Sequence, residues 1–333
     1  MRRAFAIWSV LALAALTLLA LALAIGSTRL SAPDVLHALL HADGSVAAEI
    51  VTRLRLPRAL AAFATGGLLA LAGALMQILL RNPLADPYVL GVSGGAAVGA
   101  LAAMLAGLGA VAVDLGAAAG ACCAILLVFG LARRDFVRRQ LSGSVDGSAR
   151  LLLTGVILAS GWGAIITFML TLAPDNRLRG MLFWLMGDLN GADSWAPALA
   201  ALVACVAAAY PAARELNLLA RGDEVAHSLG VRVSALRRRI YFVASIGTAL
   251  AVTTAGTIGF IGLIVPHALR LVTGNDQRVQ LPACALAGGI LLLAADTVAR
   301  TVVAPQQLPV GVIMALIGVP VFVLLLTRAP RKT

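Results

Sequence analysis

The glycine-rich run Gly91–Gly95 is the stretch of this chain whose residue types most suggest phosphate chemistry. A loop that cradles nucleotide phosphates needs a lysine beside its glycines, because the ammonium group contacts the phosphate oxygens. The only lysine of the chain is Lys332, far from this run. We therefore predict that the chain does not hydrolyse ATP, and that Gly95 and Gly99 form a small-residue pair for close helix packing.

Cysteine and histidine side chains could bind a metal, but their spacing does not predict a metal site. His267 follows a proline in an apolar segment, and imidazole can ligate haem iron; we favour a structural hydrogen bond for it instead. The sequence predicts no catalytic residue, no metal site and no cofactor in this chain. The cysteines lie in apolar runs without ligand spacing, at Cys122, Cys123, Cys205 and Cys284.

Two polar stretches flank the second expected helix. The first, Arg53–Arg58, places Pro57 in the first helical turn, where the missing N–H group of proline costs nothing. The second, Gln77–Gly94, follows the helix, and Pro83 and Pro87 within it force a fixed non-helical turn. The arginines of the first stretch indicate an acidic partner, with lipid head groups as the alternative.

The most polar loop of the chain is Leu218–Gly230. Its pattern predicts a short amphipathic helix from Asp223 to Leu229, with Gly230 as its C-terminal stop. A small helix of this kind suits docking into a groove on a soluble partner. Further glycine- and proline-punctuated stretches lie at Gly256–Arg270, Ala294–Arg300 and Leu308–Val312.

The residues that separate these stretches are strongly apolar. Hydrophobic residues make up 61% of the 333 and charged residues 12%, against about 45–50% and about 25% in soluble domains. The composition predicts an all-α polytopic membrane protein, because backbone polar groups in lipid must be satisfied within each segment. The formal net charge of +11 fits basic cytoplasmic loops, and we expect no nucleic-acid partner.

Ten membrane helices are expected in one transmembrane domain that covers residues 1–333. A run near the N-terminus could instead be a signal peptide, but its length favours a first span. A cytoplasmic coupling loop is expected at about residues 214–238. The expected helices cover residues 4–26, 57–80, 93–110, 115–133, 149–172, 194–213, 237–255, 259–272, 280–300 and 308–327.

Charge distribution orients these helices. With both termini in the cytoplasm, 19 of the 26 basic residues lie inside and 7 outside, which predicts a multi-pass protein of the bacterial inner membrane. Apart from arginines near their ends, the expected spans contain almost no ionisable side chain, and Asp296 and His267 are the only candidates. Ion-coupled transporters place charged groups in the membrane, so an external energy source is favoured over the alternative, an ion-coupled secondary transporter of a small solute.

Taken together and in this order, the polar stretches resemble the permease family of type II ABC importers. These are the FecCD-type subunits that import ferric siderophores, haem and vitamin B12. The resemblance runs from about Leu54 to about Leu326. The motifs that carry it are RLPR, RNPLADPYxLGVSxGA, GDExAxSLG, GxIGFxGLIVPH and LPVG.

The resemblance implies the type II permease fold with ten helices and a second permease subunit, expected to form a homodimer. It also implies two cytoplasmic ATPase subunits that bind ATP and Mg²⁺, and a periplasmic substrate-binding protein. The motif matches assign docking of the binding protein to Arg55, Arg58 and Arg300, ATPase coupling to Gly222, Asp223, Glu224 and Leu229, and a cytoplasmic gate to Asn82, Pro83, Leu84, Gly147 and Ser148.

Three residues depart from the family pattern: Arg221, Gln277 and Gln307. Arg221 stands where an apolar residue is common, Gln277 where histidine is frequent, and Gln307 where glutamate is frequent. The resemblance leaves three substrates open: ferric siderophore, haem and corrinoid. The family as a whole favours the ferric siderophore. Pathway positions expected on the fifth helix are Thr154, Ser160, Trp162 and Met169.

Overall fold

The computed structural model describes residues 2–26, 28, 30–41, 44–138, 146–191 and 195–328, and these residues form helices and connecting segments without a β-strand. The α-helices are α1 (Arg2–Ala24), α2 (Ala32–Leu40), α3 (Val46–Glu49), α4 (Leu56–Leu80), α5 (Val92–Leu105), α6 (Ala110–Arg138), α7 (Asp146–Leu172), α8 (Asp175–Met186), α9 (Trp195–Ala209), α10 (Ala213–Leu219), α11 (Asp223–Ser228), α12 (Val233–Ala255), α13 (Ile261–Thr273), α14 (Gln277–Ala299) and α15 (Val310–Arg328). A π-helix, η1 (Ile50–Arg55), and two 3₁₀ turns, η2 (Pro87–Leu90) and η3 (Tyr210–Ala212), complete the described elements.

Each of the ten expected helices has a counterpart, so the all-helical fold is confirmed. Within the described ranges, six helical segments are long and apolar enough to cross a membrane by length and composition. Shorter apolar helices are Val92–Leu105, Ile261–Thr273 and Val310–Leu325. The count of ten crossings therefore stays a prediction.

Two regions outside the ten expected membrane helices contain further helical segments. The expected coupling loop at 214–238 holds α10 in addition to the predicted short helix, α11, and both follow the helical break at η3. Pro211 lies in η3 and supplies no N–H group, so α9 cannot continue through it unchanged. The residues Ile50–Arg55, which precede Pro57, form the π-helix η1, and the amide of Leu56 donates to the carbonyl of Val51. Pro57 itself lies in the first turn of α4, as expected.

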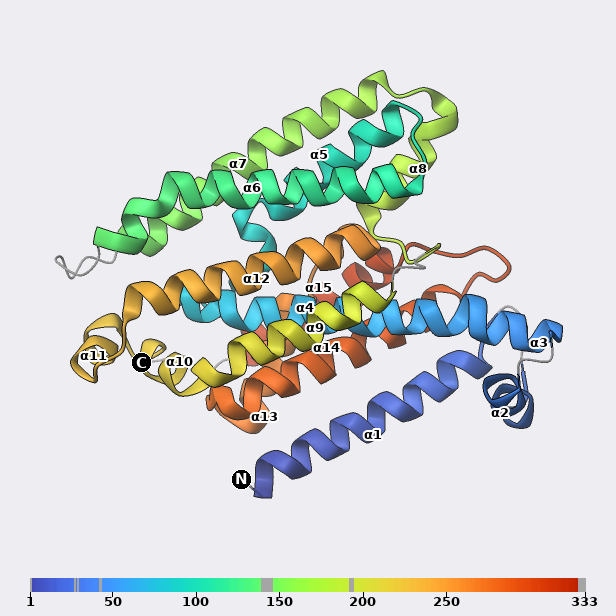
Figure 1. Ribbon diagram of the computed structural model, residues 1–333, viewed down its shortest axis with the longest axis horizontal. Helices are drawn as coiled ribbons and strands as arrows, with labels where there is room; N and C mark the ends of the chain where they lie inside the picture. Colours follow the sequence, from blue (N-terminus) through green and yellow to red (C-terminus); the bar gives the residue numbers. More distant parts are fainter. Residues whose placement is uncertain are drawn as a thin grey trace.

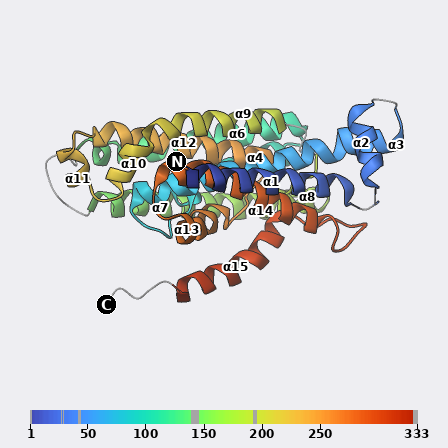
Figure 2. The same cartoon turned by 90° about the horizontal axis from the view of Figure 1, so that it is seen from below.

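Helix α4 forms the centre of the bundle, with α14, α12, α9 and α13 packed around it (Figure 1). Nearly all of its side chains are buried, because it is apolar on every face. Small residues allow the close crossings: a Cβ atom on Gly73 would lie 2.0 Å from the carbonyl oxygen of Gly262 in α13. Helix α15 points away from the rest of the bundle (Figure 2).

The two ends of the bundle carry different elements. One end, here called the α11 end, holds α10, α11 and the last turn of α13; the opposite end, here called the α2 end, holds α2 and α3 (Figures 1 and 2). The motifs assigned to coupling and to docking thus lie at opposite ends of the bundle. This separation is what a transport pathway along the bundle requires.

Helices α5 and α6 pair through glycines, as the sequence predicts for Gly95 and Gly99. Gly95 faces Gly120, and Gly99 faces Gly116; a Cβ atom on Gly99 would lie 1.9 Å from the carbonyl oxygen of Gly116. Membrane helices use such small-residue contacts to bring their backbones together.

A single methyl group at this crossing should therefore be costly. We expect Gly99→Ala to lower the free energy of unfolding by roughly 1–3 kcal/mol, because backbone on the facing helix must move. Gly130→Ala on α6 is the matched control, since among the described residues no atom from outside the local backbone of α6 lies within 4 Å of its added Cβ. Thermal unfolding in detergent measures both; equal melting temperatures would contradict the packing interpretation.

Candidate functional site

Helix α11 is a single short helix presented at the α11 end. Gly222 precedes it with a φ of +132°, which favours glycine. Gly230 ends it in the left-handed region, and the amides of Gly230 and Val231 close the end by donating to the carbonyls of His227 and Ala226. The predicted helix and its glycine stop are therefore confirmed.

The side chains of α11 divide into an inner and an outer set. Ala226 is fully buried against the bundle. Glu224 is exposed, and Leu229 is 61% exposed just after the helix. An exposed carboxylate and an exposed apolar side chain are suited to contact with another protein. Asp223 points the other way.

Asp223 joins α11 to two long helices. Nη2 of Arg237, near the start of α12, lies 2.9 Å from its carboxylate. Nη2 of Arg81, which follows α4, also donates to it. Arg237 is buried and Arg81 is partly exposed. Because the carboxylate holds both guanidinium groups, a displacement of α11 acts on α4 and α12 together.

Arg81 also terminates α4 in an unusual backbone conformation. It has a φ of 51°, in the left-handed region that costs a non-glycine residue roughly 1–2 kcal/mol. The amide of Arg81 donates to Ile78, and that of Asn82 donates to Gln77, which closes the helix end. In the turn that follows, Oδ1 of Asn82 accepts the amide of Leu84 at 2.9 Å. The expected gate turn is thus ordered and is directly connected to Asp223 through Arg81.

Gln77 connects the end of α4 to α13. Pro266 within α13 has no N–H group to donate to the carbonyl of Gly262, four residues earlier. Nε2 of Gln77 donates to that carbonyl at 3.2 Å and so replaces the lost bond. Arg270 in turn donates to Oε1 of Gln77. Nδ1 of the neighbouring His267 has no hydrogen-bond partner in the described chain, so the structural bond expected for it is not seen there.

The second half of the expected gate is placed differently. Gly147 and Ser148 lie in the first turn of α7, where a loop was expected. Helix α7 begins at Asp146, about one turn before the expected start at residue 149, because the polar residues Asp146–Ser148 form its first turn. Their side chains lie outside the described part of the chain, and their role as a gate stays a prediction.

Asp86, between α4 and α5, starts η2 by accepting the amide of Tyr88 at 2.8 Å. Burial raises the pKa of the Asp86 carboxyl to about 6, against an ordinary value of 3.8, while the Tyr88 amide acts in the opposite direction. Between these two pH values the folded chain holds a proton that the unfolded chain has released. Stability therefore falls as pH rises through this window.

We expect Asp86→Asn to be more stable than the wild type at pH 7.5, by about 1–3 kcal/mol, because asparagine keeps the acceptor and removes the buried charge. The difference should vanish near pH 4. Asp276→Asn should show the opposite sign at pH 7.5, since hydrogen bonds from Arg278 lower the pKa of Asp276 to about 2 and that stabilisation is lost only as pH falls through this value. Unfolding measured across pH 4–8 tests both variants.

At the α2 end, Asp296 organises a buried charge cluster. Its fully buried carboxylate accepts Nε of Arg58 at 3.0 Å and Nη2 of Arg58 at 2.8 Å. Nε of Arg300 lies 3.1 Å from the same carboxylate. Nη1 of Arg58 also donates to Asn190 and Gln307, each at 2.6 Å. The cluster joins α4, α14 and the segments before α9 and α15.

Arg55, the third arginine assigned to docking, is buried as well. Its Nη1 donates to the carbonyl of Leu23 at 2.6 Å, which satisfies the end of α1. All three assigned side chains are thus turned into this chain, with exposed fractions of 5% for Arg55, 8% for Arg58 and 7% for Arg300. Internal acceptors hold the three side chains in the chain by itself, and their assignment to docking stays a prediction. Arg53, by contrast, is 78% exposed.

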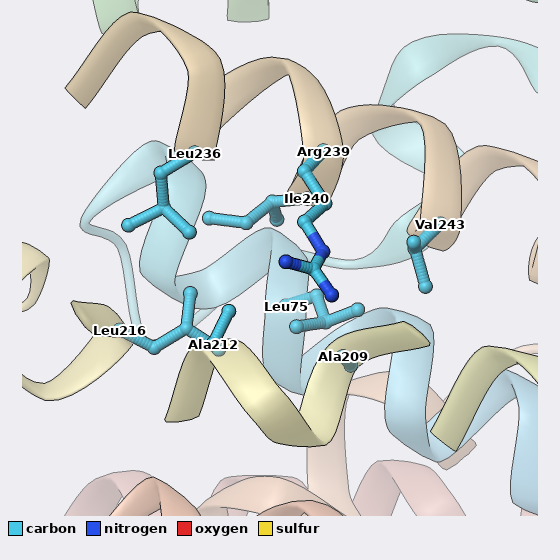
Figure 3. A pocket seen from close by; sticks show the side chains of 8 residues that line it. All are labelled: Leu75, Ala209, Ala212, Leu216, Leu236, Arg239, Ile240 and Val243. Carbon is cyan, nitrogen blue, oxygen red and sulfur yellow. The ribbon is translucent and has the colours of Figure 1, made fainter. Parts of the chain in front are cut away.

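Two cavities that the sequence did not indicate lie along the chain. One, of about 500 Å³, opens beside the charge cluster and includes Asn190, Arg179 and Phe183 in its lining. The other measures about 10 Å³, room for at most one water, and Figure 3 shows that Arg239 reaches into it between α12 and α9. Arg239 donates to the carbonyl of Ala208 near the end of α9. The guanidinium group therefore serves the end of that helix, and the cavity is not a ligand site.

The expected pathway positions on α7 point in different directions. The ring of Trp162 packs on Gly94 of α5, and Met169 is buried. Ser160 is exposed, while Thr154 is partly buried. The exposed face of α7 is mainly apolar and includes Ile157 and Phe168, so only Ser160 of the four lies on an open surface.

The sequence and the fold of this chain both match known membrane transport proteins. The model of the FecCD transport family matches residues 13–328. The chain is 45% identical over 281 residues to the cobalamin import system permease protein BtuC of Halobacterium salinarum, covering 83% of this chain and 73% of that protein. It is 43% identical over 285 residues to the vitamin B12 import system permease protein BtuC of Salmonella paratyphi A, covering 84% of each. A solved metal-chelate type ABC transporter in an inward-facing conformation matches with a TM-score of 0.82 at 28% identity, covering 98% of this chain and 100% of that one.

Proposed function

Because the chain belongs to the FecCD transport family, and is therefore a permease subunit of an ABC importer and not an enzyme, we propose that it carries a corrinoid of the vitamin B12 class into the cell. The relatives at 42–45% identity are named as cobalamin or vitamin B12 import permeases. These names support a corrinoid over the ferric siderophore that the family as a whole favours. Haem and ferric siderophore are the alternative substrates, and the uptake experiment below distinguishes them from a corrinoid. The second permease subunit is a copy of this chain.

The observation that carries the mechanism is the Asp223 bridge. ATP binding by two cytoplasmic ATPase subunits, which hold the nucleotide and Mg²⁺, moves the exposed face of α11. Asp223 transmits this motion to Arg81 at the end of α4 and to Arg237 in α12. The gate turn at Asn82–Leu84 follows Arg81 and moves with it. Access to the pathway then alternates between the two sides of the membrane.

A periplasmic binding protein delivers the corrinoid at the α2 end. Docking through Arg55, Arg58 and Arg300 requires acidic groups of that protein to replace the internal acceptors, since all three side chains are buried. The exposed Arg53, paired only with Glu49 at 3.5 Å among the described residues, meets the partner first. Charge reversal at Arg53 should weaken docking most at low salt, because exposed pairs are screened.

Uptake by proteoliposomes tests the proposed function. The chain is reconstituted with its ATPase subunits and binding protein, and the accumulation of cyanocobalamin, haemin and a ferric siderophore is compared with and without ATP. We expect ATP-dependent accumulation of cyanocobalamin. Accumulation of another chelate alone would reassign the substrate, and uptake driven by an ion gradient without the ATPase subunits would favour a secondary transporter.

A further inference from the structure

A groove of about 760 Å³ opens at the α11 end, next to the turn after α4 that the proposed mechanism moves. Three segments far apart in the sequence form it: the end of α4 with the turn after it, α10 with the residues that follow, and the connection from α13 to α14. Its polar lining is Gln77, Arg81, Asn217, Arg221, Arg270, Asn275, Asp276, Gln277 and Arg278.

The charges of this groove do not cancel. Arg81 is bonded to Asp223, and Arg278 lies 2.9 Å from Asp276. Arg221 and Arg270 have no carboxylate partner among the described residues; Arg270 donates a hydrogen bond to the neutral amide of Gln77.

No acid in the groove can neutralise these two arginines. Asp276, the one acidic side chain in the lining, is already held by Arg278 and by Nδ2 of Asn217 at 2.9 Å. These bonds lower its pKa to about 2, so it stays ionised at physiological pH and its pairing does not change. The groove therefore presents two guanidinium groups to whatever enters it.

Arg221 links the groove to α11. It lies two residues before Asp223, so a soluble partner that covers α11 also covers the mouth of the groove. Two of the three departures from the family pattern, Arg221 and Gln277, line this groove.

We propose that the groove receives an acidic segment of the cytoplasmic ATPase subunit, with partner carboxylates pairing with Arg221 and Arg270. The inference rests on the proposed function and adds to it a second contact, which selects the cognate ATPase subunit while α11 transmits motion. Arginine suits this role, because its planar guanidinium pairs with a carboxylate through two parallel hydrogen bonds.

Binding of the purified ATPase subunit to the chain in nanodiscs tests the proposal. In zwitterionic lipid and low salt, Arg221→Glu should weaken binding about tenfold, and the loss should shrink as salt screens the charges. Arg270→Gln, which keeps the fold by retaining a polar group beside Gln77, should weaken it less. Arg238→Glu makes the same charge change on an exposed residue of α12 outside the groove and should leave affinity near the wild-type value.

Reciprocal charge exchange gives the strongest support. An acidic-to-arginine variant of the ATPase subunit should restore binding to Arg221→Glu and to no other variant. Unchanged affinity of Arg221→Glu at low salt would overturn the proposal. So would loss of bound anionic lipid from this variant in phosphatidylglycerol nanodiscs without the ATPase subunit, because the groove would then be a head-group site. If the wild type itself binds no ATPase subunit, the proposed function fails instead.

Discussion

Asp223→Asn is expected to lower ATP-dependent uptake at least about tenfold while the ATPase subunits continue to hydrolyse ATP. The substitution keeps the size of the side chain and removes the charge that holds Arg81 and Arg237. Buried charge-assisted pairs are worth more than exposed ones, and Arg237 is only 5% exposed. Motion of α11 would then no longer reach α4 and α12. The measurement is the number of substrate molecules transported per ATP hydrolysed.

Glu224→Gln is the matched control, because it makes the same chemical change at the next residue, whose side chain is exposed. It should change affinity for the ATPase subunit and leave the transport ratio intact. Arg81→Gly distinguishes the effect of the backbone conformation from that of the ion pair. Glycine adopts a φ of 51° without steric cost, but it removes the ion pair with Asp223. We expect it to uncouple as Asp223→Asn does. A normal transport ratio in Asp223→Asn would contradict the bridge as the coupling element.

Local patterns in the sequence were sufficient to predict several of these elements. Helix α11 and its stop at Gly230 follow from a polar, amphipathic stretch with a glycine after it, which is short-range information. The close helix packing at Gly95 and Gly99 follows from the spacing of these small residues, whereas their partner helix, α6, does not. The apolar helices follow from composition, because lipid excludes any other open backbone structure.

Side-chain direction required the structure. Asp223 and Glu224 are adjacent and chemically alike, yet one holds the bundle and the other faces outward. Gln77 repairs the break that Pro266 makes in α13, a relation across 185 residues that no local pattern contains. The arginines assigned to docking carry the right motif, but acceptors elsewhere in the chain bury them. The sequence marks Asp296 only as an ionisable residue within an expected span, and its ion pair with Arg58 joins residues that are far apart in the chain.

Asp296→Asn is expected to give the largest loss of stability, about 3–5 kcal/mol, because it leaves the charges of Arg58 and Arg300 buried without their carboxylate. A loss of this size would exceed a third of the stability of many domains, so little folded protein should be recovered from membranes. The measurement is the yield of monodisperse protein and its melting temperature in detergent. Arg53→Gln, which breaks only an exposed pair with Glu49, should cost at most about 1 kcal/mol.

A triple variant decides whether the loss comes from the unpaired charges. If Asp296→Asn is combined with Arg58→Met and Arg300→Met, no guanidinium remains to be compensated, and much of the stability should return. The same triple variant should fail to dock the binding protein if these arginines act as the family resemblance implies, although the fold is restored. Stability that stays low in the triple variant would mean that the hydrogen bonds of Arg58 to Asn190 and Gln307, and not the ion pairs, hold the α2 end together.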